Sequence, residues 1–334
     1  MLIYPATPVP SWTYPANEGF KTLVSDFDSG IEIRRKLLRF SKKNFSLSYK
    51  NAPLSDRNIL HDFYRNVGGM ADSFWFVDWV NKKWIDEFVG RGALYPLTGA
   101  VADDGGVQTV ETDHASDATA NDMTLLPVVP AVNDAYYFIG TTPFDVLRIH
   151  IGTPGVGTWT VVWEYWKGSW SALSGVTDGT SAFKAAAGAH DILWTKPTDE
   201  VATTIAGIAG YAIRARVSAY TSVTTQPKGS QAWKGTRYYD LHSLTTNPYV
   251  IYIDGVAKTG GDTDYTFISG GGEAGADRIK LTVMANIGSL ITSDLTGFLR
   301  IKARLGDDNF PEEMVAPTNG GLFNIQLKVV EVQW

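Results

Sequence analysis

The chain has 334 residues, a formal net charge of −6 and no cysteine. This length allows about two compact domains, and the lack of cysteine excludes disulfide bridges and thiolate metal sites. The negative charge argues against nucleic-acid binding, whose affinity comes largely from neutralised phosphates, and against attachment to anionic membrane surfaces. Charged residues make up only 19% of the chain, below the ~25% of typical soluble domains. A low charged fraction is expected of a protein that buries extra surface in an assembly.

The N-terminal segment, Met1 to Pro5, has neither the positive flank nor the apolar run of a signal peptide. No stretch of the sequence approaches the ~20 apolar residues that cross a bilayer as a helix. We therefore expect a soluble protein that is made in a reducing cytoplasm, is not exported by the usual route and does not insert into membranes.

Several segments alternate apolar with polar side chains. This period of two is typical of half-buried strands in antiparallel sheets. Glycine-rich runs at 260–261 and 270–272 separate such segments and predict turns. The sequence thus predicts a mainly β fold built from antiparallel sandwich-like or barrel-like sheets. The clearest strands are residues 45–49, 147–151, 211–217 and 299–305.

One short helix is predicted, over residues 55–66, and an aromatic strand follows it at 74–78. Ser55 is a candidate N-cap, Asp56 lies in the first turn, and Gly68 is placed to end the helix. Apolar side chains then fall on one helical face. They are Ile59, Leu60, Phe63, Tyr64 and Val67.

The composition changes twice along the chain, which predicts an insertion. Residues 96–126 are rich in Gly, Asp, Ala and Thr and are interpreted as a connecting segment, and residues 227–235 as a linker. Residues 127–226 between them are predicted to form an inserted β-sandwich. The host domain is then discontinuous and consists of residues 1–95 and 236–334.

The five histidines do not predict a metal site. They are far apart and form no i, i+3 or i+4 pair on a helix, so the convergent ligands of a zinc site are lacking. We interpret each as a surface or edge residue. They are His61, His114, His150, His190 and His242.

Other catalytic patterns are also missing. No serine lies in a Gly-x-Ser-x-Gly turn, and Gly270-Gly271-Gly272 lacks the Lys-Ser/Thr of a phosphate-binding loop. Asp262 and Asp264 offer oxygen ligands for calcium, but without the spacing of a calcium loop a turn is the favoured interpretation. The adjacent acids at 307–308 and 312–313 resemble a glycosidase pair only in residue type, and solvated loop acids are favoured. We expect no catalytic residue, no cofactor and no metal, and therefore a protein that is not an enzyme.

Tryptophans are concentrated in the predicted insertion. Trp159 and Trp163 share one strand face with Val161 and Tyr165, and this face is expected to be core. Trp166 and Trp170 flank a Lys-Gly-Ser turn. Exposed aromatic rings suit contacts with sugars or proteins, so Trp166 and Trp170 are candidate glycan- or partner-contact residues, with local packing as the alternative.

Short motifs occur in a fixed order at the two ends of the chain. The N-terminal ones are Phe27-Asp-Ser-Gly30-Ile-Glu32 with Arg35, Phe45-Ser-Leu-Ser-Tyr49, the helix, and Phe74-Trp-Phe-Val-Asp78. The C-terminal ones are Val250-Ile-Tyr-Ile-Asp254-Gly255, Asp264-Tyr265-Thr266, a strand near Ile279, Phe298 to Leu305, Asp307-Asp-Asn-Phe310 and Leu327-Lys-Val-Val-Glu331-Val. Over roughly residues 11–95 and 236–334 this order resembles the distal-tail-type proteins of tailed bacteriophages and gene transfer agents. The central module departs from that pattern and looks like an accessory β-sandwich of phage virion proteins.

The resemblance implies a structural protein of the virion, assembled in the host cytoplasm, that forms a ring, expected to be a hexamer, between the tail tube and the tail tip or baseplate. Its expected partners are copies of itself, the tail tube protein and the hub, tip or fibre proteins. The inserted module is expected to lie outside the ring and to contact fibres or a host-surface glycan. The alternatives are a related minor tail component, a receptor- or glycan-binding tail-tip or fibre protein, and a polysaccharide-degrading enzyme.

Overall fold

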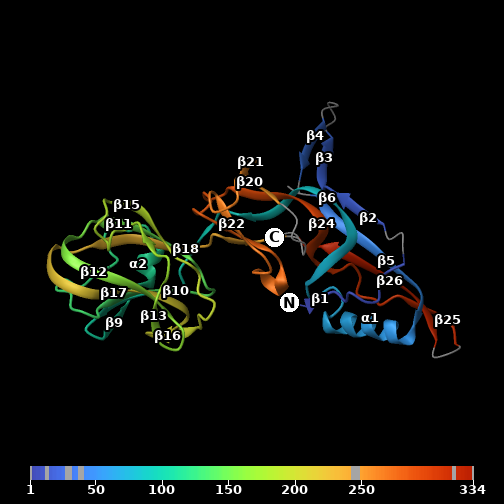
Figure 1. Ribbon diagram of the computed structural model, residues 1–334, viewed down its shortest axis with the longest axis horizontal. Helices are drawn as coiled ribbons and strands as arrows, with labels where there is room; N and C mark the ends of the chain where they lie inside the picture. Colours follow the sequence, from blue (N-terminus) through green and yellow to red (C-terminus); the bar gives the residue numbers. More distant parts are fainter. Residues whose placement is uncertain are drawn as a thin grey trace.

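The computed structural model describes residues 2–11, 15–26, 32–36, 41–241, 249–317 and 321–332. Strands account for 56% and helices for 7%, which confirms the predicted mainly β, sandwich-like fold class. The chain forms two lobes that lie side by side (Figure 1). One lobe contains both ends of the chain, and we call it the two-ended lobe. The other contains the middle of the chain, and we call it the inserted lobe.

The two-ended lobe is built on a large curved sheet. Its described strands pair antiparallel, apart from the short β1, which runs parallel to β6. Along the sheet the strands are β1 (Leu2–Ile3), β6 (Phe74–Arg91), β24 (Leu290–Leu305), β26 (Leu322–Glu331), β5 (Lys42–Pro53) and β2 (Ala16–Gly19), with β20 (Val250–Ile253) and β21 (Val256–Lys258) beside β24 and β25 (Glu312–Ala316) beside β26.

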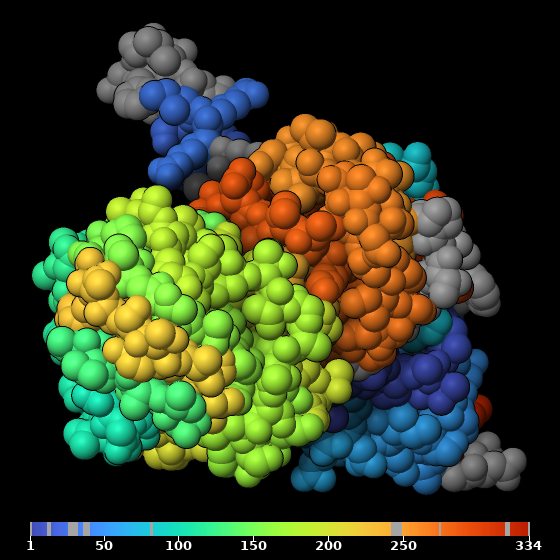
Figure 2. All heavy atoms as spheres, turned by 60° about the vertical axis from the view of Figure 1, so that its left-hand side comes forward, coloured from blue at the N-terminus to red at the C-terminus, as the bar shows by residue number. Residues whose placement is uncertain are grey.

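Two smaller sheets accompany the large one. A three-stranded sheet contains β19 (Tyr238–Asp240), β23 (Arg278–Leu281) and β22 (Tyr265–Ile268), with the short 3₁₀ turn η1 (Glu273–Gly275) between its last two strands in the sequence. A hairpin of β3 (Thr22–Asp26) and β4 (Glu32–Lys36) projects from the lobe, and we call it the arm (Figures 1 and 2).

The inserted lobe is a β-sandwich. One sheet contains β13 (Trp170–Ala172), β12 (Val156–Trp166), β17 (Ile208–Thr225), β10 (Ala135–Gly140), β8 (Gly99–Asp104) and β9 (Val107–Val110), with β16 (Thr203–Ile205) beside β17. The facing sheet contains β14 (Thr177–Asp178), β15 (Gly188–Leu193), β11 (Val146–Thr153), β18 (Lys228–Gly235) and β7 (Leu94–Pro96), and a short helix, α2 (Thr112–Ser116), contacts β18 and β8.

The hydrophobic cores divide the chain in the same way as the sheets. One core draws its side chains from residues 4–89 and 239–329. A second core, between the sandwich sheets, and a small third one come from residues 97–232. No cluster of buried side chains in the described part of the chain mixes the two sets, so the insertion has a core of its own.

The boundaries of the insertion differ from those predicted. Residues 96–126 are not a connecting segment, because β8, β9 and α2 lie within them and β8 pairs with β10 in the sandwich. Residues 227–235 are not a linker, because β18 pairs with β11 in the facing sheet. Within these segments only β9 is an edge strand with exposed side chains, whereas β8 and β18 are paired on both sides and largely buried, so composition alone did not distinguish them from loops.

The insertion begins and ends on paired strands. Leu94 in β7 lies opposite Gly235 in β18, and Pro96 lies opposite Trp233. The chain therefore enters and leaves this lobe at the same place. The insertion is thus best bounded at about residues 94 and 235.

Helix α1 (Leu54–Asn66) covers one side of the large sheet and contacts β5 and β26. Asp56 lies in its first turn, as predicted, and Gly68 adopts a left-handed φ of 60° just after its end. Ser55 is not the N-cap, because the helix begins one residue earlier and Pro53 occupies that position with no side-chain cap. Of the predicted apolar face, Leu60, Phe63 and Val67 are buried, Tyr64 is half-buried and Ile59 is exposed.

The predicted strands and part of the tail-like motifs can be located. Residues 45–49, 147–151, 211–217 and 299–305 lie in β5, β11, β17 and β24. The segment from Phe27 to Ile31 and His242 lie outside the described residues.

Candidate functional site

The tryptophan-rich strand β12 confirms the predicted core face. Trp159, Trp163 and Tyr165 are buried in the core of the sandwich, and Val161 packs partly buried against it. The indole N–H groups of these two tryptophans have partners: Trp159 Nε1 donates to the carbonyl of Ala182 (2.9 Å) and Trp163 Nε1 to Asp178 Oδ2 (3.1 Å). These side chains are therefore structural.

Trp166 and Trp170 lie opposite each other in the β12–β13 hairpin. Their ring centroids are 5.3 Å apart with an interplanar angle of 69°, and both side chains are half-buried. The guanidinium of Arg214 lies 4.2 Å from the centre of the Trp170 ring, and Tyr137 contacts the same ring at 5.5 Å. One part of the Trp170 surface is thus occupied by neighbours from its own sheet, which leaves Trp166 as the more available ring of the candidate pair.

An ion cluster lies beside this pair. Glu164 accepts hydrogen bonds from Arg214 (2.7 Å) and Arg216 (2.9 Å). Burial raises the pKa of Glu164, but the hydrogen bonds and charges of both arginines outweigh it, so the pKa lies below its ordinary value. Each charge in this cluster is satisfied within the sheet, so the cluster orients Trp170 and offers no free group for chemistry.

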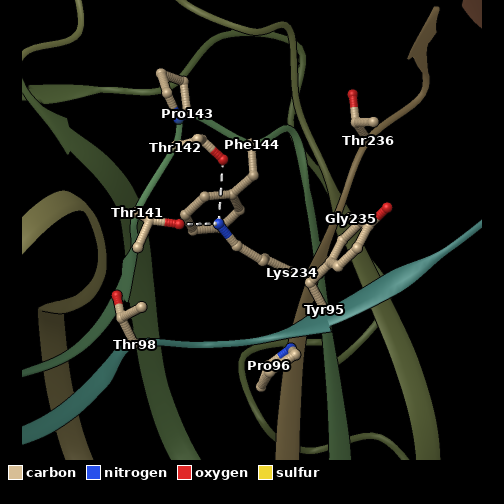
Figure 3. Close-up of a pocket in the computed structure, with 10 residues that line it drawn as sticks. All are labelled: Tyr95, Pro96, Thr98, Thr141, Thr142, Pro143, Phe144, Lys234, Gly235 and Thr236. Atoms are coloured by element: carbon tan, nitrogen blue, oxygen red, sulfur yellow. Dashed lines mark hydrogen bonds between the residues drawn. The ribbon is translucent and has the colours of Figure 1, made fainter. Parts of the chain in front are cut away.

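A pocket of about 430 Å³ opens where β7 and β18 meet the loop between β10 and β11. Figure 3 shows Lys234 reaching from β18 toward Thr141 and Thr142 of this loop. The rest of the lining is aromatic, proline, threonine and glycine: Tyr95, Pro96, Thr98, Pro143, Phe144, Gly235 and Thr236.

Lys234 is the only charged side chain among the described residues that line the pocket. It is 8% exposed, and its Nζ donates to Thr141 Oγ1 (3.2 Å) and Thr142 Oγ1 (3.1 Å). Burial lowers the pKa of Lys234. Its stem runs against Gly140, where a Cβ would lie only 2.9 Å from the Lys234 Cδ, so a larger residue at position 140 would displace the lysine side chain. Within the described part of the chain, no carboxylate forms an ion pair with Lys234.

The sequence did not predict this pocket. Lys234 and Thr142 are 92 residues apart, and a lone lysine in a strand and a Thr-Thr pair in a loop are common. Lys234 in β18 meets Thr142 because β18 pairs with β11, the strand that follows the loop containing Thr142. The sequence carries no separate signal for the contact.

The other candidates do not converge. No group of three or more His, Asp or Glu side chains suited to a metal ion occurs among the described residues. Asp264 Oδ2 accepts from the backbone N–H of Thr259 (2.8 Å), and Asp262 accepts from the hydroxyl of Thr266, so both lie in a hydrogen-bonded turn, as favoured. Asp308 accepts from the N–H of Met70 (2.9 Å), and Glu312 pairs with Arg57 (2.6 Å).

Among the described residues, no helix has the length and apolar character needed to cross a membrane. A comparison with models of known families and with curated proteins found no match for this chain.

Proposed function

We propose that the chain is a structural protein of a phage tail, a distal-tail-type protein that forms a ring between the tail tube and the tail tip. The tail-like motifs at the two chain ends motivate the choice of family. The proposal of assembly rests on the arm. Its strands β3 and β4 pair with each other and with no other described strand.

The arm forms a two-stranded sheet of its own and exposes apolar side chains. Leu23, Val24 and Ile33 are 49%, 48% and 55% exposed. Because Leu23 and Val24 are neighbours on one strand, they point to opposite faces of the ribbon. A two-stranded ribbon is marginally stable in water, so burial of both faces against a second subunit is the arrangement that this composition favours.

Helix α1 and the edge strand β25 lie elsewhere on the same lobe and form the surface that we propose to receive the arm (Figure 1). The ion pair of Arg57 with Glu312 joins these two elements. The surface exposes Leu54 and Ile59 from the helix, and Met314 and Val315 from the edge strand.

We propose that the arm of one subunit packs on the α1–β25 surface of the next. Two different surfaces then meet in a head-to-tail contact, and such contacts generate rings when the rotation closes. The edge strand β25 would also be covered by this contact, which prevents uncontrolled association. The expected ring is a hexamer, with the inserted lobe outside it and available to fibres or a host-surface glycan.

The experiment compares the full chain with a double variant of the arm, Leu23→Asp with Val24→Asp. Light scattering after size exclusion and negative-stain images should show rings for the unaltered protein and monomers for the variant, with unchanged circular dichroism. The matched control is Val128→Asp with Val129→Asp, another adjacent pair of exposed apolar side chains (71% and 72%) but in the inserted lobe. The control should keep the rings.

Two results would contradict the proposal. A protein that stays monomeric at high concentration and in particles that contain it would exclude ring formation. Rings that survive the arm variant would exclude the arm as the contact. Trimers in place of rings would favour the alternative of a tail-tip or fibre protein.

A further inference from the structure

The pocket around Lys234 combines a buried positive charge with an apolar lining. Lysine at 8% exposure without an acidic partner is unusual, because a buried ammonium is costly unless a negative group compensates it. Two of the three N–H donors of the ammonium are bonded to threonine hydroxyls, whose oxygens carry no charge. The charge itself stays uncompensated within the described part of the chain.

The hydroxyl groups of Thr141 and Thr142 add two hydrogen-bond donors to the site. An ammonium only donates, so the oxygens of Thr141 and Thr142 act as acceptors toward Lys234. Each hydroxyl hydrogen then points away from the ammonium and is available to a ligand. Thr98 and Thr236 differ, because their hydroxyls donate to the carbonyl of Ile139 (3.1 Å) and to Asp145 Oδ1 (2.9 Å). The donors presented to a ligand are therefore one ammonium and two hydroxyls.

We infer that this pocket binds a small ligand carrying one carboxylate on a sugar-sized ring, that is, an acidic monosaccharide unit. The carboxylate accepts from Lys234, Thr141 and Thr142, and charge-assisted hydrogen bonds of this kind are the strong ones. The ring carbons lie against Tyr95, which is 55% exposed, and the two prolines of the lining, whereas Phe144 is 2% exposed and offers them little surface.

The size and the charge of the pocket favour this ligand class. A pocket of about 430 Å³ falls in the usual range for small-molecule sites and leaves room around a single sugar ring. A single ammonium balances a single negative charge. A phosphate dianion would leave one charge uncompensated in a largely apolar site and has no carbon skeleton to cover Tyr95 and the prolines.

This site goes beyond the proposed ring, since none of its lining residues belongs to the arm or to the α1–β25 surface. It also differs from the Trp166 and Trp170 pair, which lies in the β12–β13 hairpin of the other sheet. If the inserted lobe contacts a surface polysaccharide, this pocket makes the contact selective for acidic sugars.

The test uses the full chain and saturation-transfer NMR with sodium galacturonate as the probe. Galacturonate should give a signal, and the methyl ester of galacturonic acid, which keeps the ring but loses the charge, should bind about tenfold more weakly or worse. Inorganic phosphate, added as a competitor, should displace galacturonate only at higher concentrations than galacturonate itself requires. Binding should weaken as the pH rises toward the lowered pKa of Lys234, because the ammonium loses its proton.

The variant Lys234→Met should abolish the galacturonate signal. Lys228→Met is the matched control, since Lys228 lies on the same strand and also contacts a threonine hydroxyl, that of Thr124 (3.3 Å), but outside the pocket. Thr142→Val removes one of the two hydroxyls of the site at an exposed loop position and should weaken binding severalfold, so a test remains if Lys234→Met fails to fold. No signal from galacturonate, equal binding of the ester, displacement at lower phosphate concentrations, or unchanged binding in folded Lys234→Met or in Thr142→Val would each overturn the inference.

Discussion

Arg237 and Asp145 form a buried ion pair where the inserted lobe joins the two-ended lobe. Arg237 Nε lies 2.8 Å from Asp145 Oδ2, and the two side chains are 7% and 0% exposed. The same guanidinium donates to the carbonyl of Trp194 (2.7 Å) in the inserted lobe and to that of Thr282 (3.2 Å) in the two-ended lobe. One arginine therefore links both lobes to a single buried carboxylate.

We predict that Asp145→Ala destabilises the protein strongly. The change leaves the Arg237 guanidinium buried without its partner, which costs about 3–5 kcal/mol in comparable pairs. Chemical denaturation of the full chain measures the loss. Asp191→Ala is the control, because its pair with Arg148 (2.6 Å) is partly exposed and is expected to contribute about 1 kcal/mol or less. Equal losses in the two variants would show that burial does not set the strength of the Arg237 contact.

A second prediction follows from the revised boundaries of the insertion. A fragment of residues 94–235 should fold cooperatively on its own, because it contains both sheets and the whole core between them. The shorter fragment 127–226, which the composition suggested, lacks β7, β8, β9 and β18 and should be unfolded or aggregated. Circular dichroism and thermal melting distinguish the two. A cooperative melt of the shorter fragment would contradict this prediction.

The part of the fold that could be predicted is the part with a strong local pattern. Alternation identified β5, β11, β17 and β24, because each has one face in a core and the other toward solvent. The edge strand β9 could not be predicted, since its four side chains are all exposed and no alternation of buried and exposed residues marks it. The role of Lys234 could not be predicted either, because the pocket depends on contacts between segments that are distant in the sequence.

A strained turn under the tryptophan-rich strand gives a third prediction. Ser181, Ala182 and Phe183 adopt left-handed φ angles of 51°, 58° and 67°. This conformation costs about 1–2 kcal/mol for each residue other than glycine. Asp178 holds this turn by accepting from the N–H groups of Thr180 (2.8 Å) and Ala182 (3.0 Å). Asp178 also accepts a hydrogen bond from the indole N–H of Trp163, a core residue of β12.

Asp178→Ala should therefore lower the free energy of unfolding by about 2–4 kcal/mol, because several hydrogen bonds are lost at once and buried donors remain. Denaturant titration gives the value, and near-UV dichroism reports the tryptophan environment. Asp104→Ala, at an exposed position, is the control and should change stability by about 0.5 kcal/mol or less. A small effect at Asp178 would mean that the turn is maintained by packing of Phe183 alone.

Glu200 gives a pH-dependent prediction. Both of its carboxylate oxygens are buried without a hydrogen-bond partner, and burial raises its pKa to about 7, although the charge of Lys196 lowers it in part. The folded protein therefore keeps this proton up to about pH 7, whereas the unfolded chain releases it near pH ~4.3. Because the folded state binds more protons in this window, the free energy of unfolding should fall as the pH rises through it. Above the folded-state pKa the loss is complete and constant.

The variant Glu200→Gln removes the ionisable group and should remove this slope. At pH 8 it should be more stable than the unaltered protein by about 1–2 kcal/mol, less than the full pKa shift would give because solvent reaches part of the side chain. Near pH 4 the two should be almost equal, since Glu200 is then protonated in the folded state. Denaturant titrations at several pH values measure the difference, with Glu313→Gln, an exposed glutamate, as the control for the change in net charge. If Glu200→Gln and Glu313→Gln give the same dependence on pH, the carboxyl of Glu200 ionises as freely in the folded protein as in the unfolded chain.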